Sequence, residues 1–367
     1  GTFDVKLRHY TNAGVEITSG NYPATFGLTA NSEVFNTILN TNVGTKGALL
    51  VVGRAPNGAN HSALAINIDI DSATATYNYN DGNLVNFGTQ SGNMNKLGFS
   101  DAILNDDGTA ILIGYGDYNA SNKVDVFAVK LDASGAIDAD FDGNNADSSN
   151  ILPLIVDDAQ DVFANNAKAL SNGKIIVTAN TSLPGSSGLG SSYLLKFFGD
   201  GGMPETYQID TGWDVAVDGV DSDDVIKIDV DGLNQGGSSS TKIWDLAIDG
   251  SDNLYFIGSA NFAGNTQSFV AKFNGNDGSI DLTFGQNSLP GYFAPYGRAS
   301  CDPNNNAFAV NICDAQYYDK IIITSDGKVV IGTTGQSHEQ FNDGMLLKFT
   351  ESQDDSATSY TVDSGGA

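Results

Sequence analysis

The sequence predicts an all-β fold built from copies of one four-stranded antiparallel sheet, and three observations lead to this prediction. First, a short apolar strand that carries a lysine recurs at intervals of 61 to 76 residues. Second, an apolar run opened by a tight turn precedes most of these strands. Third, no segment of useful length has the periodicity of an amphipathic helix. Repetition at this period indicates one supersecondary unit that is copied and stacked.

The lysine strand is the most regular part of the repeat. In every copy the lysine position is flanked by apolar residues, and in one copy an asparagine replaces the lysine. The six copies read FDVKL around Lys6, LAINI around Asn67, FAVKL around Lys130, YLLKF around Lys196, FVAKF around Lys272 and MLLKF around Lys348.

The run before each lysine strand predicts its hairpin partner. Three of these runs begin at Asp107-Gly108, Asn172-Gly173 and Asp326-Gly327. Such dipeptides favour hairpin turns because both positions tolerate a positive φ. The five runs are GALLVVG (47–53), GTAILIG (108–114), GKIIVT (173–178), DNLYFIG (252–258) and GKVVIG (327–332).

Two further strands complete the predicted unit. Apolar residues concentrate in its second and third strands, which neighbouring sheets would cover on both faces. The first strands are expected at 101–105, 167–171, 245–249 and 320–325. The fourth, more polar strands are expected after the lysine strands, at 74–79, 136–141, 279–284 and 357–362.

Repeated four-stranded units of this kind are typical of a β-propeller. We expect a single domain over 1–367 that starts in the middle of a blade and closes with six blades. The alternative is five blades with an extra N-terminal hairpin. Two long insertions, at 211–241 and 286–317, interrupt the regular pattern. Long loops in a regular fold are often functional, so these are the first places to seek a site.

The net charge of −27 restricts the partners of the protein. A strongly acidic surface repels nucleic-acid phosphates and anionic membranes. No apolar stretch is long enough to span a bilayer. We therefore expect a monomer that binds a polysaccharide or a protein surface, binds no nucleic acid and does not insert directly into a membrane.

Several segments resemble the delta-60 repeat of bacterial secreted and surface proteins. These are VFAVKLDASGAIDADFDG (126–143), SFVAKFNGNDGSIDLTFG (268–285) and DGKVVIG (326–332). The resemblance covers about five-sixths of the chain as diverged copies, and the Asp-Leu-Thr-Phe-Gly ending is well kept only in the unit that ends at Gly285. It implies a β-propeller and no catalytic residues.

The best constellation for metal binding is acidic. Asp138, Asp140 and Asp142 precede Gly143 with the spacing of a calcium loop, and Asp147 follows. Closely spaced carboxylates are the ligands that calcium prefers. Ser149 stands where a bidentate glutamate is expected, and Asp138 also has a structural turn position in the repeat. The sequence thus indicates calcium as a possible cofactor.

The remaining candidates for a site lie in predicted loops. The two cysteines, Cys301 and Cys313, could form a disulfide in an extracytoplasmic protein, which is secreted, periplasmic or on the cell surface. His61 and His338 fall in corresponding loops between the second and third strands. Aromatic residues that could stack on sugars or peptides flank the cysteine insertion: Tyr292, Phe293, Tyr296, Tyr317 and Tyr318.

These features favour a non-catalytic binding module over an enzyme. No phosphate-binding loop, nucleophile elbow or metal-spaced histidine pair occurs in the sequence. The expected module is secreted or on the cell surface and recognises a polysaccharide, peptide or surface partner through its rim loops. One alternative is a carbohydrate-active hydrolase or lyase with its site in the central channel. The other is a calcium-stiffened structural spacer of a larger surface protein.

Overall fold

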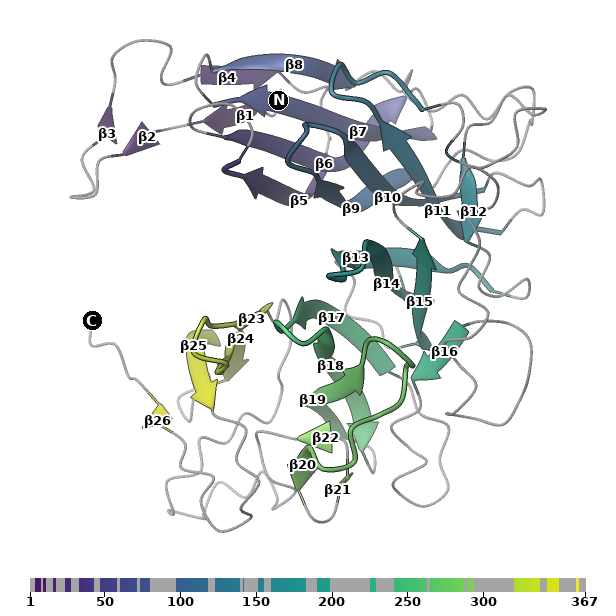
Figure 1. Ribbon diagram of the computed structural model, residues 1–367, viewed down its shortest axis with the longest axis vertical. Helices are drawn as coiled ribbons and strands as arrows, with labels where there is room; N and C mark the ends of the chain where they lie inside the picture. The colour runs from purple at the N-terminus through teal and green to yellow at the C-terminus, as the bar shows by residue number, and fades with distance from the viewer. Residues whose placement is uncertain are drawn as a thin grey trace. The chain divides into compact units, whose positions relative to one another are not determined.

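The part of the chain described by the computed structural model contains strands, turns and bends but no helix (Figure 1). This part of the chain therefore has no helix that could cross a membrane. The described residues are 4–7, 9–10, 16–17, 24–27, 33–42, 47–57, 60–70, 73–79, 97–117, 123–138, 141, 151–154, 160–182, 190–198, 225–228, 241–262, 265–286, 289–290, 292–293, 320–336, 342–349 and 361–362.

The described residues form five four-stranded antiparallel sheets, the blade type of a β-propeller. The predicted fold class is thereby confirmed, whereas the number of blades stays a prediction. The chain divides into two compact units, which are considered separately below. Unit 1 comprises residues 1–167 and 199–207, and unit 2 comprises residues 168–198 and 208–367.

Unit 1 contains two complete blades. In each, the strands follow one another in space as they do in sequence, so neighbouring strands of the sheet are also consecutive along the chain. The first blade consists of β5 (Glu33–Asn40), β6 (Ala48–Asn57), β7 (Asn60–Asp69) and β8 (Thr74–Tyr79), and the second of β9 (Gly98–Leu104), β10 (Ala110–Gly116), β11 (Asp125–Leu131) and β12 (Leu152–Leu154).

Three blades follow along the chain, and the division between the units falls within the first strand of the earliest one. Their strands are β13 (Phe163–Ala169), β14 (Lys174–Asn180), β15 (Ser192–Phe198) and β16 (Val225–Ile228); β17 (Thr241–Ile248), β18 (Asn253–Phe262), β19 (Asn265–Asn274) and β22 (Tyr292–Phe293); and β23 (Lys320–Ile323), β24 (Val329–Gln336), β25 (Asn342–Phe349) and β26 (Thr361–Val362).

Three two-stranded ladders complete the described structure. The first lysine strand is β1, which pairs with β4 and places Lys6 opposite Thr25. A second ladder joins β2 to β3, and a third joins β20 to β21. Their strands are β1 (Asp4–Leu7), β2 (His9–Tyr10), β3 (Glu16–Ile17), β4 (Ala24–Gly27), β20 (Gly285–Gln286) and β21 (Leu289–Pro290).

The Asx-Gly turns lie where the sequence predicts them, between the first and second strands of their blades. Only the glycine of each dipeptide has a positive φ, 85° at Gly108, 80° at Gly173 and 75° at Gly327. Each glycine N–H donates to the carbonyl oxygen three residues earlier, as Gly108 does to Asn105. The turns are thus three-residue hairpins with a left-handed glycine, not two-residue turns with positive φ at both positions.

The predicted fourth strands at 136–141 and 279–284 are wrong. Each segment makes one isolated bridge to its lysine strand, Ile137 to Leu131 and Ile280 to Phe273, and then turns away. At the second site the turn is held by Asp281, whose carboxylate accepts from the backbone N–H and hydroxyl of Thr283 at 3.0 and 2.6 Å. A local side-chain turn of this kind competes with strand pairing.

The true fourth strands of three blades come from later residues. They are β12, β16 and β22, and the last two lie inside the predicted insertions at 211–241 and 286–317. Parts of both insertions therefore complete blades. The fourth strand predicted at 74–79 is confirmed as β8, and β26 lies within the one predicted at 357–362.

Each unit has its own apolar core between sheet faces. In unit 1 the side chains of the second and third strands dominate it, among them Leu112, Phe127 and Val129, all fully buried. In unit 2 the corresponding residues include Phe256, Phe269 and Phe273. Second and third strands that are covered on both faces agree with their near-continuous apolar sequences.

Candidate functional site

The first strands of three blades have a β-bulge directly before a buried or half-buried Asn or Asp. The register against the second strand shifts between Val34 and Asn36, between Phe99 and Asp101, and between Ile243 and Asp245. Bulges redirect side chains and are frequent near active sites. We use the term bulge edge for the end of a sheet at which its first strand begins and its second strand ends.

A glycine near the end of the second strand makes this bulge possible. A Cβ on Gly53 would lie 2.0 Å from the carbonyl oxygen of Glu33, and one on Gly258 would lie 2.6 Å from that of Lys242. On Gly114 it would lie 2.7 Å from the carbonyl oxygen of Gly98. Only glycine allows two backbones to approach this closely. The final glycine of three predicted second strands, Gly53, Gly114 and Gly258, is therefore explained.

The Asp after the bulge connects neighbouring first strands. In unit 1 the fully buried carboxylate of Asp101 accepts from Asn36 Nδ2 at 2.7 Å, from the Ala102 N–H at 2.8 Å and from the Ala167 N–H at 2.8 Å. In unit 2, Asp245 accepts from the Ile321 N–H at 3.1 Å. These carboxylates serve the packing of blades, because buried backbone donors require partners.

The bulge edge of unit 1 holds an arginine–glutamate pair on an aromatic ring. Arg54 donates to Glu33 from Nε at 3.0 Å and from its terminal nitrogen at 2.9 Å. Its guanidinium lies 5.6 Å from the ring centroid of Phe35. Burial disfavours the charged guanidinium, but the hydrogen bond and charge of Glu33, together with Tyr115, raise the pKa of Arg54 above its ordinary value. The guanidinium therefore stays charged, and its two hydrogen bonds fix the glutamate beside it.

Tyr115 lies beneath this pair. Its ring centroid is 6.4 Å from that of Phe35 and 5.1 Å from that of Phe163, and the side chain is fully buried. A Cβ on Gly98 would come within 2.9 Å of the tyrosine oxygen. Burial raises the pKa of Tyr115 far above its ordinary value, so the phenol stays protonated.

Two aspartates belong to the same edge of the second blade in unit 1, and a third, from the segment before β13, binds to it. Asp117 follows the last residue of β10 and is 6 % exposed, and Asp125 begins β11 and is 1 % exposed. The carboxylate of Asp161 accepts from the Val124 N–H at 3.1 Å. Together with Glu33, these residues concentrate carboxylates where the first strands begin and the second strands end.

The bulge edge of unit 2 has different chemistry on the same backbone. The Nζ of Lys242 lies 4.5 Å from the ring centroid of Trp244, whose Nε1 donates to the Ser259 hydroxyl at 2.7 Å. Lys242 is fully buried, and this burial lowers the pKa of its ammonium to about 8. One polar residue nearby, Asn180, joins the second strand of one blade to the first strand of the next, since it exchanges hydrogen bonds with the backbone of Ile243.

The structure brings few of the predicted ligand-binding residues to this edge. Tyr292 and Phe293 form β22, the outermost strand of their blade, opposite Ala271 and Val270, and not a rim loop. His61 lies within β7 opposite Pro56 and so is not in a loop either. Four further predicted residues lie outside the described part of the chain: Tyr296, Tyr317, Tyr318 and His338.

The predicted calcium loop is only partly described. Asp138 forms an ion pair with the repeat lysine, Lys130, at 3.3 Å. Asp140, Asp142 and Asp147 lie outside the described residues, as do the predicted disulfide partners Cys301 and Cys313. Among the residues that are described, no three His, Cys, Asp or Glu side chains gather as metal ligands would.

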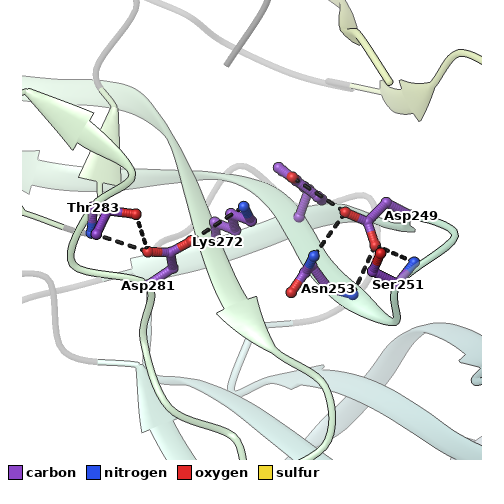
Figure 2. Close-up of polar contacts among 7 residues, drawn as sticks. Asp249, Ser251, Asn253, Lys272, Asp281 and Thr283 are labelled. Carbon is purple, nitrogen blue, oxygen red and sulfur yellow. Dashed lines mark hydrogen bonds and ion pairs between the residues drawn. The ribbon is translucent and has the colours of Figure 1, made fainter. Parts of the chain in front are cut away.

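The same lysine–aspartate pair recurs in unit 2, which indicates a structural role for this position of the repeat. Lys272 lies 3.1 Å from Asp281, and its Nζ is 5.4 Å from the ring centroid of Tyr255 (Figure 2). Figure 2 also shows the nearby turn, where Asp249 accepts from the N–H groups of Ser251 and Asn253 at 2.8 and 2.9 Å. Burial raises the pKa of the Asp249 carboxyl, but these hydrogen bonds outweigh it and hold the pKa below its ordinary value.

No family model and no curated protein matches the chain. Solved structures similar to it include an exo-1,5-alpha-L-arabinanase from a bovine ruminal metagenomic library, with 10 % identity, 93 % of this chain and 100 % of that chain covered, and a TM-score of 0.41. A thermostable family-43 glycoside hydrolase has 10 % identity, 94 % of each chain covered and a TM-score of 0.40. An endo-arabinase from Bacteroides thetaiotaomicron has 10 % identity, with 86 % of this chain and 93 % of that chain covered, and a TM-score of 0.42.

These matches contradict the first functional expectation from the sequence, a non-catalytic binding module. All three proteins are named as glycoside-cleaving enzymes and none as a binding module. That expectation is therefore corrected. With identities of 10 % and TM-scores below 0.5, the matches themselves assign no activity to this chain, so the case for a function has to come from its side chains.

Proposed function

We propose that the protein is a carbohydrate-active hydrolase or lyase whose reacting groups lie at the bulge edge of unit 1. The observation that supports this most is that Glu33, Asp117 and Asp125 all stand at or next to strand ends of that edge, where Arg54 binds Glu33 and Asp161 accepts from the Val124 N–H. Cleavage of a glycosidic bond requires two carboxyl groups in different environments, one to donate a proton and one to act as base or nucleophile.

The carboxylates of this edge differ in the way such chemistry needs. The side chain of Glu33 is 48 % exposed and is bound by an arginine. Asp117 and Asp125 are buried at the end of the adjoining hairpin. A protonated phenol such as that of Tyr115 can donate a hydrogen bond to a developing negative charge. We assign Asp117 and Asp125 as the candidate reacting carboxyls and Tyr115 as the candidate hydrogen-bond donor.

The test is the release of reducing ends from arabinan, xylan, β-glucan and polygalacturonate by purified protein. Asp117→Asn and Asp125→Asn should each lower the rate at least about 100-fold, as loss of an acid or base does. Asp132→Asn, which changes an exposed turn carboxylate in the same unit, is the matched control and should keep the rate. If the wild-type protein releases nothing, or both variants match it, the proposal is refuted.

The calcium ion remains a proposal from the sequence. Asp138, Asp140, Asp142 and Asp147 would supply its oxygen ligands, and the ion would have to compete with Lys130 for Asp138. A spacer stiffened by calcium would melt at a lower temperature after chelation, because a ligand that binds the folded state stabilises it. If the melting temperature is the same with and without EDTA, both the calcium ion and its stiffening role are refuted.

We also propose that this is an extracytoplasmic, monomeric protein of the delta-60 repeat type. The recurrence of the lysine–aspartate pair, Lys130 with Asp138 and Lys272 with Asp281, supports a common repeat origin. A Cys301–Cys313 disulfide would fit an oxidising location. Peptide mapping without reduction tests the disulfide, and size-exclusion chromatography with light scattering tests the monomer.

A further inference from the structure

We infer that Glu33 and Phe35 form a sugar-binding subsite for neutral glycans, with Arg54 as its positioning residue. The inference deepens the proposed function and rests on it for the class of ligand. It stands on three properties of the bulge edge of unit 1, namely an exposed but fixed carboxylate, a fixed aromatic ring beside it and a backbone that holds both.

The carboxylate is unusual for a surface group because it is both exposed and held in one orientation. Glu33 leaves 48 % of its side chain in solvent, whereas Arg54 leaves 13 %. The arginine binds both glutamate oxygens through a bidentate contact. A ligand that bonds to Glu33 therefore meets an acceptor whose rotamer entropy has already been lost on folding.

The aromatic ring is fixed on the same strand. Phe35 occupies the bulge position of β5 and is partly exposed. The guanidinium of Arg54 covers it at 5.6 Å, and Tyr115 packs against it with ring planes inclined by 36°. These two neighbours fix the ring, while Phe35 as a whole stays partly exposed.

The backbone gives this arrangement little freedom to move. The second strand approaches so closely at Gly53 that a Cβ there would overlap the Glu33 carbonyl oxygen. The bulge follows at Phe35, two residues after Glu33 on the same strand. Sites built on rigid strands hold their side chains more accurately than sites built on loops.

The chemistry of this pair matches a neutral sugar. A sugar ring presents an apolar face to an aromatic side chain and hydroxyl donors to a carboxylate, and binding sites combine apolar surface with a few oriented polar groups in this manner. Arg54 is neutralised by Glu33, so the pair offers no net positive charge to a uronate. The net charge of −27 disfavours polyanionic glycans further.

The test is affinity electrophoresis in native gels that contain arabinan, xylan, β-glucan or polygalacturonate. Apparent dissociation constants come from the mobility at several glycan concentrations, relative to a gel without glycan. We expect at least one neutral glycan to retard the wild-type protein and polygalacturonate to have no effect. Phe35→Ala and Glu33→Gln should each weaken the retardation about tenfold, which corresponds to about 1.4 kcal/mol.

Three further variants separate a binding role from a structural one. Phe35→Leu keeps apolar volume without the ring and should weaken binding while preserving the melting temperature. Arg54→Lys keeps the charge but loses the bidentate contact, and it should raise the dissociation constant with folding intact. Leu39→Ser changes an exposed residue of the same strand, 57 % exposed, and should bind as the wild type does.

The outcomes distinguish the subsite from the enzyme. If retardation is lost in Phe35→Ala and Glu33→Gln, the subsite is supported. If, in addition, neither the wild type nor any variant cleaves a glycan, the hydrolase or lyase is refuted. Cleavage by the wild type with equal retardation of all variants overturns the subsite and leaves the enzyme. Absence of retardation by every neutral glycan, or retardation by polygalacturonate alone, also overturns the subsite.

Discussion

The β5–β6 pair of unit 1 and the β17–β18 pair of unit 2 have the same backbone but opposite chemistry. Both carry a bulge before an Asn or Asp and a glycine that faces the start of the first strand. At the first position of this edge, one has Glu33 bound to an arginine and the other has the fully buried Lys242. The residue at the bulge is aromatic in both, Phe35 and Trp244.

This comparison separates what the repeat maintains from what it leaves variable. The bulge, the glycine and the buried Asx connect backbone to backbone, so a change there is felt by the whole blade. The side chains at the bulge edge, exposed as at Glu33 or buried as at Lys242, can differ between blades without altering this framework. A constant frame with variable edge residues is what allows one fold to support different sites.

The largest predicted effect comes from removing the buried carboxylate of unit 1. Asp101→Ala leaves the side chain of Asn36 and the N–H groups of Ala102 and Ala167 without this acceptor, and it should destabilise the protein by about 4 kcal/mol. Asp106→Ala, at an exposed site in the following turn, should have a much smaller effect. Urea unfolding measures both, and equal costs would contradict the framework role of Asp101.

The glycine of the second strand provides the next largest effect. Gly258→Ala places a methyl group 2.6 Å from the Lys242 carbonyl oxygen and 2.7 Å from the Phe269 ring, which should cost about 2 to 3 kcal/mol. Gly332 ends the corresponding run of β24, and a Cβ there would meet nothing within 4 Å. Gly332→Ala should therefore change the stability by less than about 0.5 kcal/mol. Similar losses in both variants would show that the close approach is not the cause.

A smaller effect, of opposite sign, is expected at Lys242. Its pKa in the folded protein, about 8, lies below the ordinary value of 10.5, so folding stability is reduced below pH 8 and recovers as the pH rises toward 10.5. Lys242→Met should stabilise the protein at pH 7 by about 1 to 2 kcal/mol, because it removes a desolvated charge at similar volume. It should also abolish the rise in stability between pH 8 and 10.5. Melting curves between pH 7 and 10.5 test this prediction. If the Lys242→Met variant still gains stability between pH 8 and 10.5, Lys242 is not the source of that gain.

The smallest effect concerns the lysine–aspartate pair. Burial raises the pKa of Asp281, but hydrogen bonds from Thr283 and Lys272 outweigh it and hold the pKa below 3.8. The stabilisation is thus complete above pH 3.8 and is lost as the pH falls through the lower folded value. Asp281→Ala should cost about 1 kcal/mol at pH 7 and progressively less in acid. A cost that stays constant down to pH 2 would assign the effect to packing.

The comparison also shows why the second and third strands of the blades could be predicted, whereas the fourth strands of three blades could not. Apolar periodicity and Asx-Gly turns are local signals, and they located β10, β14 and β18 with their neighbours. The segment at 279–284 alternates like a strand, but the side chain of Asp281 holds its end in a turn. An alternating pattern of apolar and polar residues indicates which residues can pair with a neighbouring strand. A competing side-chain hydrogen bond decides whether they do.

The candidate site was missed for a related reason. The sequence analysis sought binding residues in long loops, but the described cluster lies on regular strands. One signal was present: an aromatic residue directly precedes the Asx in Phe35-Asn36 and Trp244-Asp245, and in the sequence of Tyr318-Asp319. Aligning the first strands with one another, instead of the lysine strands, would have revealed it.

By itself, the sequence determined that this protein is built from repeated four-stranded β-sheets and where most hairpins turn, since both follow from the periodicity and turn chemistry of neighbouring residues. Only the tertiary structure decided which strand closes each blade and which charged groups meet. Glu33 and Arg54 are 21 positions apart, and Asp101 and Ala167 are 66. Contacts over such distances depend on register and bulge geometry, which no local pattern of residues contains.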